Sequence, residues 1–540
     1  MHNNVNPAVG IDLGTTNTVV AVQIDPMGPM ILEIPQPVSE RSIVEPILNI
    51  KSAVYFEDNS NVVVGEFANP KISAFRSMKS NMGTRWKVKH PFRKQFITAS
   101  YINAHILKLA HQTIIKKFPS WDSSALITVP ASFNTDQRND TIVAADLAGF
   151  KNVKLLDEPT AAFYYFFNQH RDSNEFNDLK NILVFDFGGG TLDVSVISIK
   201  DDKHQMILDA IGRSRYNNIG GDDIDLELAT FLLGCWEYKQ GQEVTELSKS
   251  QKEYLYRLFI TKSSLFKEEA EDYIINDLEL PEFVIIEEDP DSQVGNFRRT
   301  MSLSQYEAVT GKFLQNKSDL NIYRPIEEAL SVANNIDSNF SRKSLDLVLY
   351  TGGSTKILGV QRALESYFSG KICLSIDEED ACNTVALGAA ACRYDELFKE
   401  KNILMTNRIL ENVFTRTPSS KLYTTILPLE TIPTKNFLKV DKTFRTDRPL
   451  INLKFPLFRG VSKQDHQLAP MRDLEIPLDQ IIEESTPYSL HYRLTENKTI
   501  ELKVIFETRQ GPIDGKAKVK IFDDMVKTKN DTPLCKVNAI

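Results

Sequence analysis

Two short glycine turns, each between an apolar strand and an alternating one, contain the residues best suited to chemistry in this sequence. The first turn is in AVGIDLGTTNTVVAV at residues 8–22, and the second is in NILVFDFGGGTLDVSVI at residues 181–197. Aligning Asp12 with Asp186 also aligns Gly14 with Gly188, at an offset of 174 residues. The chain therefore carries the same turn twice.

Each turn could bind a phosphate group and its metal ion. Glycine lets the backbone approach an anion closely, so that several N–H groups can point at phosphate oxygens. The hydroxyls of Thr15, Thr16 and Thr191 would add donors, while Asp12 and Asp186 suit a hydrated Mg²⁺. An ordinary hairpin explains one such turn equally well, but two of them indicate a clamp around one nucleotide.

Two further glycine pairs occur in NIGGDDID at residues 218–225 and in LYTGGSTKI at residues 349–357. The second pair opens directly into a predicted helix. Paired glycines and helix N-termini suit nucleoside and phosphate contacts, although a structural loop explains either pair taken alone. Two lobes that each offer one turn to the same polyphosphate correspond to the plan of actin-like and sugar-kinase-like ATPases.

The elements that would position these turns change character near residue 400. Before it, strand patterns such as ALITVP (125–130) alternate with helix patterns such as TDQRNDTIVAADLAG (135–149), which is typical of α/β folds. After it, short alternating segments such as LINLKFPLF and TIELKVIF predict a β-sandwich. We therefore predict a two-lobed, actin-like α/β nucleotide-binding domain with duplicated ribonuclease-H-like halves over residues 1–398. A linker (399–416), a β-sandwich domain (417–524) and a short tail (525–540) would follow.

Composition excludes several function classes. The 540 residues are 42% hydrophobic and 25% charged, with a net charge of -9, which disfavours binding to nucleic acid or to anionic membranes. No signal-peptide pattern or long apolar run is present, so we expect a cytoplasmic protein. The five cysteines include no C-x-x-C pair, and the eight histidines show no metal-ligand spacing. The basic run at residues 85–94 fits a solvated hairpin about Pro91 better than a nucleic-acid site.

Taken in order, the motifs resemble those of the seventy-kilodalton heat shock protein (DnaK-type) chaperones. The similar blocks are GIDLGTTNT, ITVPASFNTDQR, DEPTAA, FDFGGGTLDVS, IGGDDID, TGGSTKI and VALGAA. TIPTK at residues 431–435 resembles part of that family's peptide-binding β-domain. The resemblance implies an ATPase with ATP or ADP and Mg²⁺ as cofactors and with unfolded or extended polypeptide as its partner.

The resemblance also assigns roles to single residues. Candidates for catalysis are Asp12, Glu158, Thr191, Asp193 and Lys71, and candidates for binding the metal are Asp12 and Asp186. Pro130 and Arg138 match residues that relay the nucleotide state to the peptide domain. Candidates for nucleotide binding are Gly14, Thr15, Thr16, Asn17, Asp186, Gly188, Gly189, Gly190, Gly220, Gly221, Lys262, Gly352, Gly353, Ser354 and Lys356.

Departures from the family pattern affect the nucleotide site. Asn69 stands where the family is expected to have a catalytic lysine, after Gly-x-x-Ala, and Lys71 could replace it. In LFITKSSLFKEE, Lys262 is retained, but Phe259 and Phe266 occupy the two other adenine-binding positions. Cys382 stands where the family usually has Asp. These differences predict slow hydrolysis and altered recognition of the base.

Other departures concern partners. Lys154 replaces an Arg read by J-domain co-chaperones, and the linker segment ILMTN (403–407) has no Asp, so contacts with a J-domain protein or a nucleotide exchange factor would be altered. Only residues 525–540 follow KVKIFDD, which predicts that a helical lid is missing. Three functions remain open: an ATP-dependent chaperone, an ATP-binding regulatory partner with weak or no hydrolysis, and a small-molecule kinase.

Overall fold

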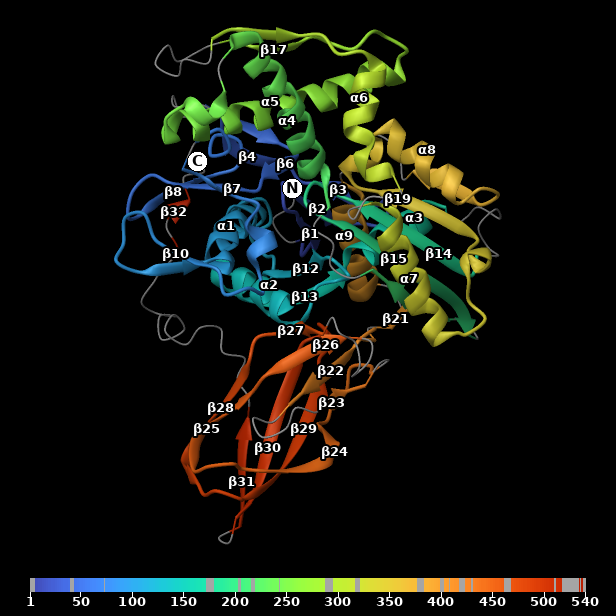
Figure 1. The fold of residues 1–540 in the computed structure, drawn as a ribbon. Helices are drawn as coiled ribbons and strands as arrows, with labels where there is room; N and C mark the ends of the chain where they lie inside the picture. The colour runs from blue at the N-terminus through green and yellow to red at the C-terminus, as the bar shows by residue number, and fades with distance from the viewer. Residues whose placement is uncertain are drawn as a thin grey trace. The chain divides into compact units, whose positions relative to one another are not determined.

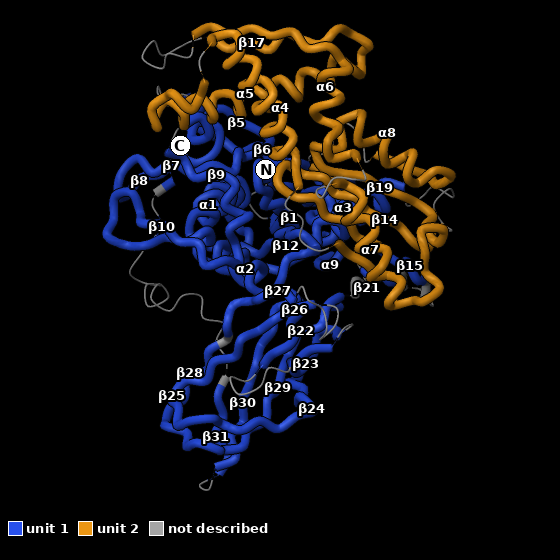
Figure 2. Tube along the Cα trace, in the orientation of Figure 1, with its two compact units in different colours: residues 1–173, 197–211, 385–540 blue, residues 174–196, 212–384 orange. Residues whose placement is uncertain are grey.

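The chain divides into two compact units in the computed structural model. Unit 1 contains residues 1–173, 197–211 and 385–540, and unit 2 contains residues 174–196 and 212–384 (Figure 2). Cys382 and most of the predicted tail lie outside the described residues. The structure describes all residues except 1–4, 39–42, 72, 171–178, 203–204, 215–218, 242, 287–294, 316–320, 376–382, 399–402, 407, 417–422, 429–430, 461–467, 509–510, 517–533, 535 and 538–540.

Unit 1 is built on a sheet with the strand order β13-β12-β1-β2-β3, with β6 paired to β2 (Figure 1). Strands β1 and β2 form an antiparallel hairpin, whereas β12 and β13 run parallel to β1. All six residues of β12 are buried, as expected for a strand covered on both faces. The strands are β1 (Ala8–Leu13), β2 (Asn17–Gln23), β3 (Met30–Ile31), β6 (Asn49–Lys51), β12 (Ser124–Val129) and β13 (Asn152–Asp157).

A second sheet repeats this topology, with the order β20-β19-β14-β15-β16-β21. Here β19 runs parallel to β14, and β20 runs parallel to β19, just as β12 and β13 follow β1. Asp12 and Asp186 are the penultimate residues of β1 and β14. The predicted duplication is therefore confirmed. The strands are β14 (Asn181–Phe187), β15 (Leu192–Asp202), β16 (Gln205–Arg213), β19 (Leu347–Thr351), β20 (Ile372–Ser375) and β21 (Ile403–Thr406).

Helices connect these strands, and their ends follow the sequence signals. Asn134 and Gln137 form a capping box at the start of α2, which matches the helix predicted from residue 135. Ser248 and Gln251 do the same for α5. None of the described helices is long and apolar enough to cross a membrane. The helices are α1 (Ala99–Lys117), α2 (Thr135–Ala148), α3 (Glu158–Gln169), α4 (Gly221–Gln240), α5 (Lys249–Ile275), α6 (Leu303–Thr310), α7 (Tyr323–Ile336), α8 (Leu358–Tyr367) and α9 (Thr384–Phe398).

Unit 1 also contains a small sheet with the order β32-β8-β7-β9. The predicted hairpin in the basic run is confirmed, because β10 and β11 pair antiparallel. A short 3-10 helix, η1 (Met78–Asn81), follows β9. The strands of this region are β4 (Ile34–Pro37), β5 (Val44–Ile47), β7 (Ala53–Phe56), β8 (Asn61–Val64), β9 (Phe75–Arg76), β10 (Lys87–Lys89), β11 (Phe96–Thr98) and β32 (Lys536–Val537).

The C-terminal part of unit 1 is β-rich, as predicted. In β30 the burial alternates along the strand, so that one face joins a core that includes Leu490, Val504 and Phe506. The predicted linker contains β21, which pairs with β16, and the following strand β22. The strands are β22 (Asn412–Thr415), β23 (Thr424–Leu427), β24 (Leu438–Arg445), β25 (Leu450–Phe455), β26 (Leu457–Gly460), β27 (Ala469–Pro470), β28 (Leu474–Ile482), β29 (Pro487–Leu494), β30 (Ile500–Thr508) and β31 (Gly511–Lys516). Unit 2 has one further hairpin, β17 (Phe283–Ile285) with β18 (Phe297–Arg299).

A glycine in α9 allows this helix to pack closely against α3. A Cβ on Gly388 would lie 1.9 Å from the carbonyl oxygen of Ala161, whereas a Cβ on Gly234 in α4 would meet nothing within 4 Å. We expect Gly388→Ala to lower the free energy of unfolding by about 1–3 kcal/mol through overpacking. The matched control Gly234→Ala should raise it by about 1 kcal/mol, because alanine favours helix. Denaturant titration measures both, and an equal effect of the two changes would contradict the close packing.

Candidate functional site

The first glycine turn is pinned by a serine from the next part of the chain. The hydroxyl of Ser52 donates to the Gly14 carbonyl at 2.8 Å, and its backbone N–H donates to the Thr16 carbonyl at 2.7 Å. The side-chain oxygen of Asn17 is buried and accepts no hydrogen bond from the described residues. Unit 1 thus presents a fixed turn with one unused buried acceptor.

Asp12 lies at the end of β1 next to a buried ion pair. Its carboxylate accepts a hydrogen bond from the Thr128 hydroxyl at 3.1 Å. Burial raises the pKa of Asp12, while the nearby Lys79 ammonium and the Thr128 hydrogen bond lower it. Lys79 itself donates to a carboxylate oxygen of Glu158 at 2.6 Å, and the two residues are only 5% and 7% exposed. One acid and one cation are therefore held away from water beside the half-buried Asp12 at the end of β1.

Lys79 was not among the residues predicted from the sequence. That Asn69 stands in place of a catalytic lysine stays a prediction, and Lys79 is a second candidate for that cation. Asn69, the supposed replacement, lies in a turn where its carbonyl accepts from the Arg76 guanidinium at 2.7 Å. The ammonium of Lys71 lies 4.2 Å from the centre of the Phe67 ring. The cation beside the acids comes from η1, ten residues beyond Asn69. The FRSMKSNMG segment has no glycine pattern that could have marked this lysine.

The predicted loops of unit 2 meet one another. The Gly188 carbonyl accepts from the Gly221 N–H at 3.0 Å and from the Ser354 hydroxyl at 2.9 Å, and the Gly189 carbonyl accepts from the Asp222 N–H at 2.7 Å. Three glycine motifs that lie far apart in the sequence therefore form one hydrogen-bonded group.

Close backbone packing explains the glycines in this group. A Cβ on Gly220 would lie 2.0 Å from the Gly189 carbonyl oxygen. Gly352 has φ of +91°, and a Cβ there would lie 2.7 Å from a carboxylate oxygen of Asp186. Of the remaining predicted residues, Asp193 is buried in β15, whereas Gly353 and Lys356 are exposed in η7 (Gly353–Lys356).

A second lysine was missed in unit 2. Lys267 of α5 forms a 2.6 Å ion pair with Asp225 and donates to the Gly221 carbonyl at 3.2 Å. Lys262, the predicted residue, is half-buried five positions earlier. Burial and then the repulsion of Asp225 raise the pKa of Asp222 to about 6, while Lys267 opposes them. Lys267 therefore supplies positive charge at the glycine loops.

The two phenylalanines do not reach these loops. Phe259 and Phe266 are buried, and their rings lie 5.8 Å from the ring of Phe283, while Phe266 also contacts Tyr306. They belong to the aromatic core between α5 and the β17–β18 hairpin. Burial in this core disfavours contact of either ring with a base, and their place at two adenine-binding positions stays a prediction.

In each unit, taken by itself, the residues have the chemistry that a magnesium nucleotide needs. Mg²⁺ is usually bound through one or two carboxylates plus phosphates and water, and each unit has one carboxylate near the end of an equivalent strand, Asp12 in β1 and Asp186 in β14. Within the described ranges, no group of three or more His, Cys, Asp or Glu side chains could hold a metal ion by itself. The unused Asn17 oxygen could accept a hydrogen bond from metal-bound water or a sugar hydroxyl.

The two predicted relay residues lie beside a buried carboxylate that two cations share. Pro130 precedes a turn in which the Phe133 carbonyl accepts from Arg138 at 3.0 Å. Arg138 and Lys498 each bind one oxygen of Asp157 at 2.6 Å. Although burial acts to raise it, the two cations hold the pKa of Asp157 well below its usual range.

Lys498 comes from the tip between β29 and β30, where it adopts a left-handed backbone with φ of +57°. At the same tip, the side-chain oxygen of Asn497 accepts a hydrogen bond from the Leu155 N–H of β13 at 2.9 Å. A non-glycine residue in this conformation costs about 1–2 kcal/mol. The ion pair with Asp157 offsets that cost, so the β-rich region is fastened to β13.

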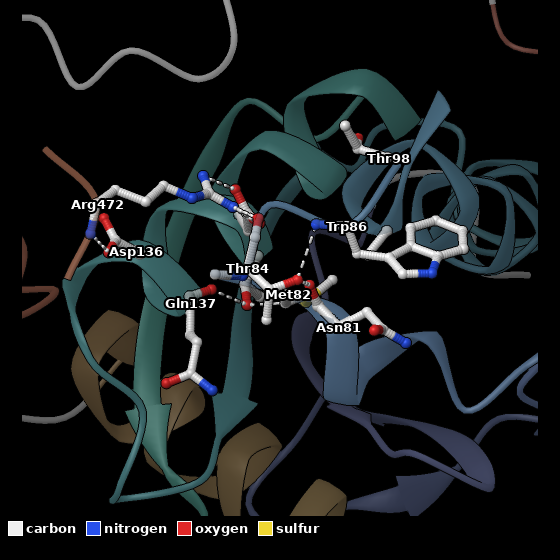
Figure 3. Close-up of polar contacts among 12 residues, drawn as sticks. Asn81, Met82, Thr84, Trp86, Thr98, Asp136, Gln137 and Arg472 are labelled. Carbon is white, nitrogen blue, oxygen red and sulfur yellow. Dashed lines mark hydrogen bonds and ion pairs between the residues drawn. The ribbon is translucent and has the colours of Figure 1, made fainter. Parts of the chain in front are cut away.

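Arg472 makes a second contact between the β-rich region and α2 (Figure 3). Its guanidinium binds both carboxylate oxygens of Asp140 at 2.9 and 2.7 Å and donates to the Thr84 carbonyl at 2.8 Å. Its N–H donates to Asp136 at 2.6 Å. Burial raises the pKa of Asp136 to about 6, although the contacts with Arg472 lower it. An arginine that binds both oxygens of one carboxylate fixes the orientation of the contact as well as adding affinity.

Comparison with known proteins identifies the family. The model of the family described as Hsp70 protein matches residues 68–460. The chain is 34% identical over 395 residues to the chaperone protein DnaK of Mycoplasma mycoides subsp. mycoides SC. The aligned region is 71% of this chain and 58% of that protein. It is 29% identical over 425 residues to the chaperone protein dnaK of Cyanidioschyzon merolae, covering 74% of this chain and 63% of that protein.

A further relative is the chaperone protein DnaK of Thermotoga maritima, at 30% identity over 388 residues, or 71% of this chain and 58% of that protein. The chain thus spans about three-fifths of the length of these relatives. The order of motifs, the duplicated sheets and the β-rich C-terminal region agree with these matches. The chain belongs to the Hsp70 family.

Proposed function

We propose that this chain is an ATP-dependent molecular chaperone that binds unfolded or extended polypeptide with an affinity set by its nucleotide state. The observation that carries the proposal is the buried Lys79–Glu158 pair beside Asp12. The pair stands beside Asp12, at the end of the strand that leads into the first glycine turn, where a cation could meet a phosphate bound by that turn. We also propose the division into domains at residues 398, 416 and 524.

ATP or ADP would bind with Mg²⁺ through the loops after β1 and β14, the Gly220–Gly221 pair and Ser354. Lys267 replaces Lys262 in this proposal, because it is the lysine that reaches those loops. When bound, Mg²⁺ would neutralise negative charge on the phosphates and bridge their oxygens.

Hydrolysis needs a positive charge on the terminal phosphate and a group that orients the attacking water. Lys79 is the candidate for the charge, since its ammonium is already dehydrated and held by Glu158. Asp12, Glu158 and Asp193 are the candidates for orienting water, and Thr191 for a hydroxyl donor. Fixed charges in a site without water act more strongly than the same charges in solution.

A weakly hydrolysing regulator remains the second candidate. The position of Lys79 beside the acids and the burial of the two phenylalanines weigh against it. The ion pairs that join the β-rich region to Asp157 favour it, since buried pairs of this kind would make release infrequent.

The proposed partners are a polypeptide client, a J-domain co-chaperone and a nucleotide exchange factor. Lys154, the position expected to meet the J-domain, forms a 3.3 Å ion pair with Glu396 of α9, and both side chains are partly exposed. A partner would therefore compete with Glu396 for this charge. A cytoplasmic location stays a prediction.

An experiment can distinguish the roles of Lys79 and Lys71. We expect Lys79→Met to slow single-turnover ATP hydrolysis about a hundredfold or more, because the terminal phosphate loses its cation in the transition state. Lys71→Met is the matched control, and its rate should stay within about twofold of the parent chain, because this ammonium packs on Phe67. ATP binding should persist in both variants, as measured by fluorescent-nucleotide titration. Slower hydrolysis in Lys71→Met, with a normal rate in Lys79→Met, would restore the sequence-based assignment.

The ion pairs of Asp157 with Arg138 and Lys498 lead to a second prediction. Lys498→Met should lower the free energy of unfolding by about 2–4 kcal/mol at pH 7, because it leaves a buried carboxylate with only one of its cations. The control Lys503→Met removes a more exposed pair with Asp514 and should cost less than about 1 kcal/mol.

The pH dependence has a defined sign. The pKa of Asp157 is lowered in the folded state, so its pairs stabilise fully above the pKa of an unfolded aspartate, about 4. The loss of unfolding free energy caused by Lys498→Met should therefore be constant from pH 8 to about 5 and should shrink on further acidification. A deficit that grows toward low pH would contradict the role of Asp157.

Hydrolysis measured with an unfolded peptide separates the two proposed functions. A chaperone should bind ATP and hydrolyse it faster when the peptide is present. Tight ATP binding with no turnover in either condition would exclude the chaperone and favour the regulator. Phosphate transfer to a small metabolite would exclude both.

A further inference from the structure

An extended segment from the C-terminal region lies along the edge of the small sheet in unit 1. Lys536 and Val537 form β32, which pairs in parallel with Asn61 and Val62 of β8. The other side of β8 pairs antiparallel with β7. Without β32, the outer edge of β8 would present unpaired N–H and carbonyl groups, which is the arrangement that accepts an added strand.

The side chains at this edge form a continuous apolar row. Val537 lies opposite Val62, and Val62 lies opposite Phe56 of β7, so that the three residues share one face. They are 4%, 0% and 3% exposed. The Phe56 ring contacts His105 of α1, with 5.5 Å between the ring centres. The row therefore ends on α1, and Val537 closes it from the outside.

The contact combines the two elements of strand recognition. Backbone pairing with an edge strand supplies affinity without regard to sequence, and a pocket for alternate side chains supplies selectivity. Here the apolar row buries Val537, and Leu534, three residues earlier, is half-buried. Among the residues that the structure describes, two pair with β8, so this part of the ladder can open without unfolding the sheet behind it.

We propose that the outer edge of β8 is a binding site for extended polypeptide, and that its occupant is the pair Lys536–Val537 of this same chain. The site is separate from the β-rich region to which we assign client binding. In one chain the segment is present at an effective concentration of the order of millimolar. A free peptide would therefore bind poorly until this segment is removed.

Competition tests the proposal. The probe is a fluorescein-labelled peptide of residues 530–540 with Cys535→Ser, and the readout is fluorescence anisotropy. A chain that lacks residues 531–540 should bind this peptide at least about tenfold more tightly than the full chain, where the site is filled. A peptide with Val537→Asp should bind the shortened chain at least about tenfold more weakly, because its carboxylate would enter an apolar pocket.

Equal binding by the full and shortened chains would overturn the proposal. Absence of binding to the shortened chain, or equal binding of the two peptides, would do the same.

Hydrogen exchange in the full chain gives a test that needs no shortened protein. Val537→Asp should speed amide exchange in β8 at least about tenfold, whereas the control Val537→Ile, which keeps the apolar contact, should leave it unchanged. Unchanged exchange in Val537→Asp would overturn the proposal. Light scattering shows which chain supplies the segment. A monomeric protein supports binding within one chain. A dimer that is lost in Val537→Asp would show that the segment binds a second copy instead.

Discussion

Two adjacent buried carboxylates, Asp157 and Glu158, set the strongest constraint on unit 1. A buried carboxylate is stable in its charged form only when a cation and hydrogen bonds replace its lost hydration. Glu158 forms an ion pair with Lys79 of η1. Asp157 forms ion pairs with Arg138 of α2 and with Lys498 of the β-rich region. Elements from three distant parts of the sequence are thus held at the junction of β13 and α3, because two neighbouring charges need partners.

This junction also gives the proposed relay a physical basis. Asp157 and Glu158 are neighbours in the chain, so the ion pair of Glu158 and the two ion pairs of Asp157 are attached to the same short stretch of backbone. The Phe133 ring lies 5.7 Å from the Lys79 ammonium, and its carbonyl accepts from Arg138. A ligand that draws Lys79 away from Glu158 would therefore act on the arginine and on the fastening of Lys498. The coupling needs only neighbouring side chains and no movement of the sheet.

The sequence predicted the parts of the fold that depend on local pattern. Strand periodicity and the repeated Asp–Gly turn predicted the duplicated sheets, and alternation in residues 499–506 predicted the β-rich region. Lys79 was missed because nothing in its surroundings is periodic or rich in glycine. Lys267 lies in the same quoted segment as Lys262, but its contacts with Gly221 and Asp225 arise only in the folded chain. Each lies near predicted residues only through the three-dimensional fold, ten residues beyond Asn69 in one case and five beyond Lys262 in the other. The cation on Asp157 could not be predicted either, since Lys498 is 341 residues away from it.

The small sheet joins the lysine to the edge of β8 through paired strands. Lys79 follows β9 after two residues, β9 pairs with β7 through Phe75 and Val54, and β7 pairs with β8. The Arg76 guanidinium in β9 also binds the carbonyls of Asn69 and Lys71, which ties the preceding turn to the same strand. Adding or removing a strand at β8 changes the stability of every strand paired behind it, because each ladder orders the next. The segment at residues 536–537 therefore stabilises the support from which Lys79 reaches Glu158, which gives a polypeptide at this edge a physical route to the proposed catalytic cation.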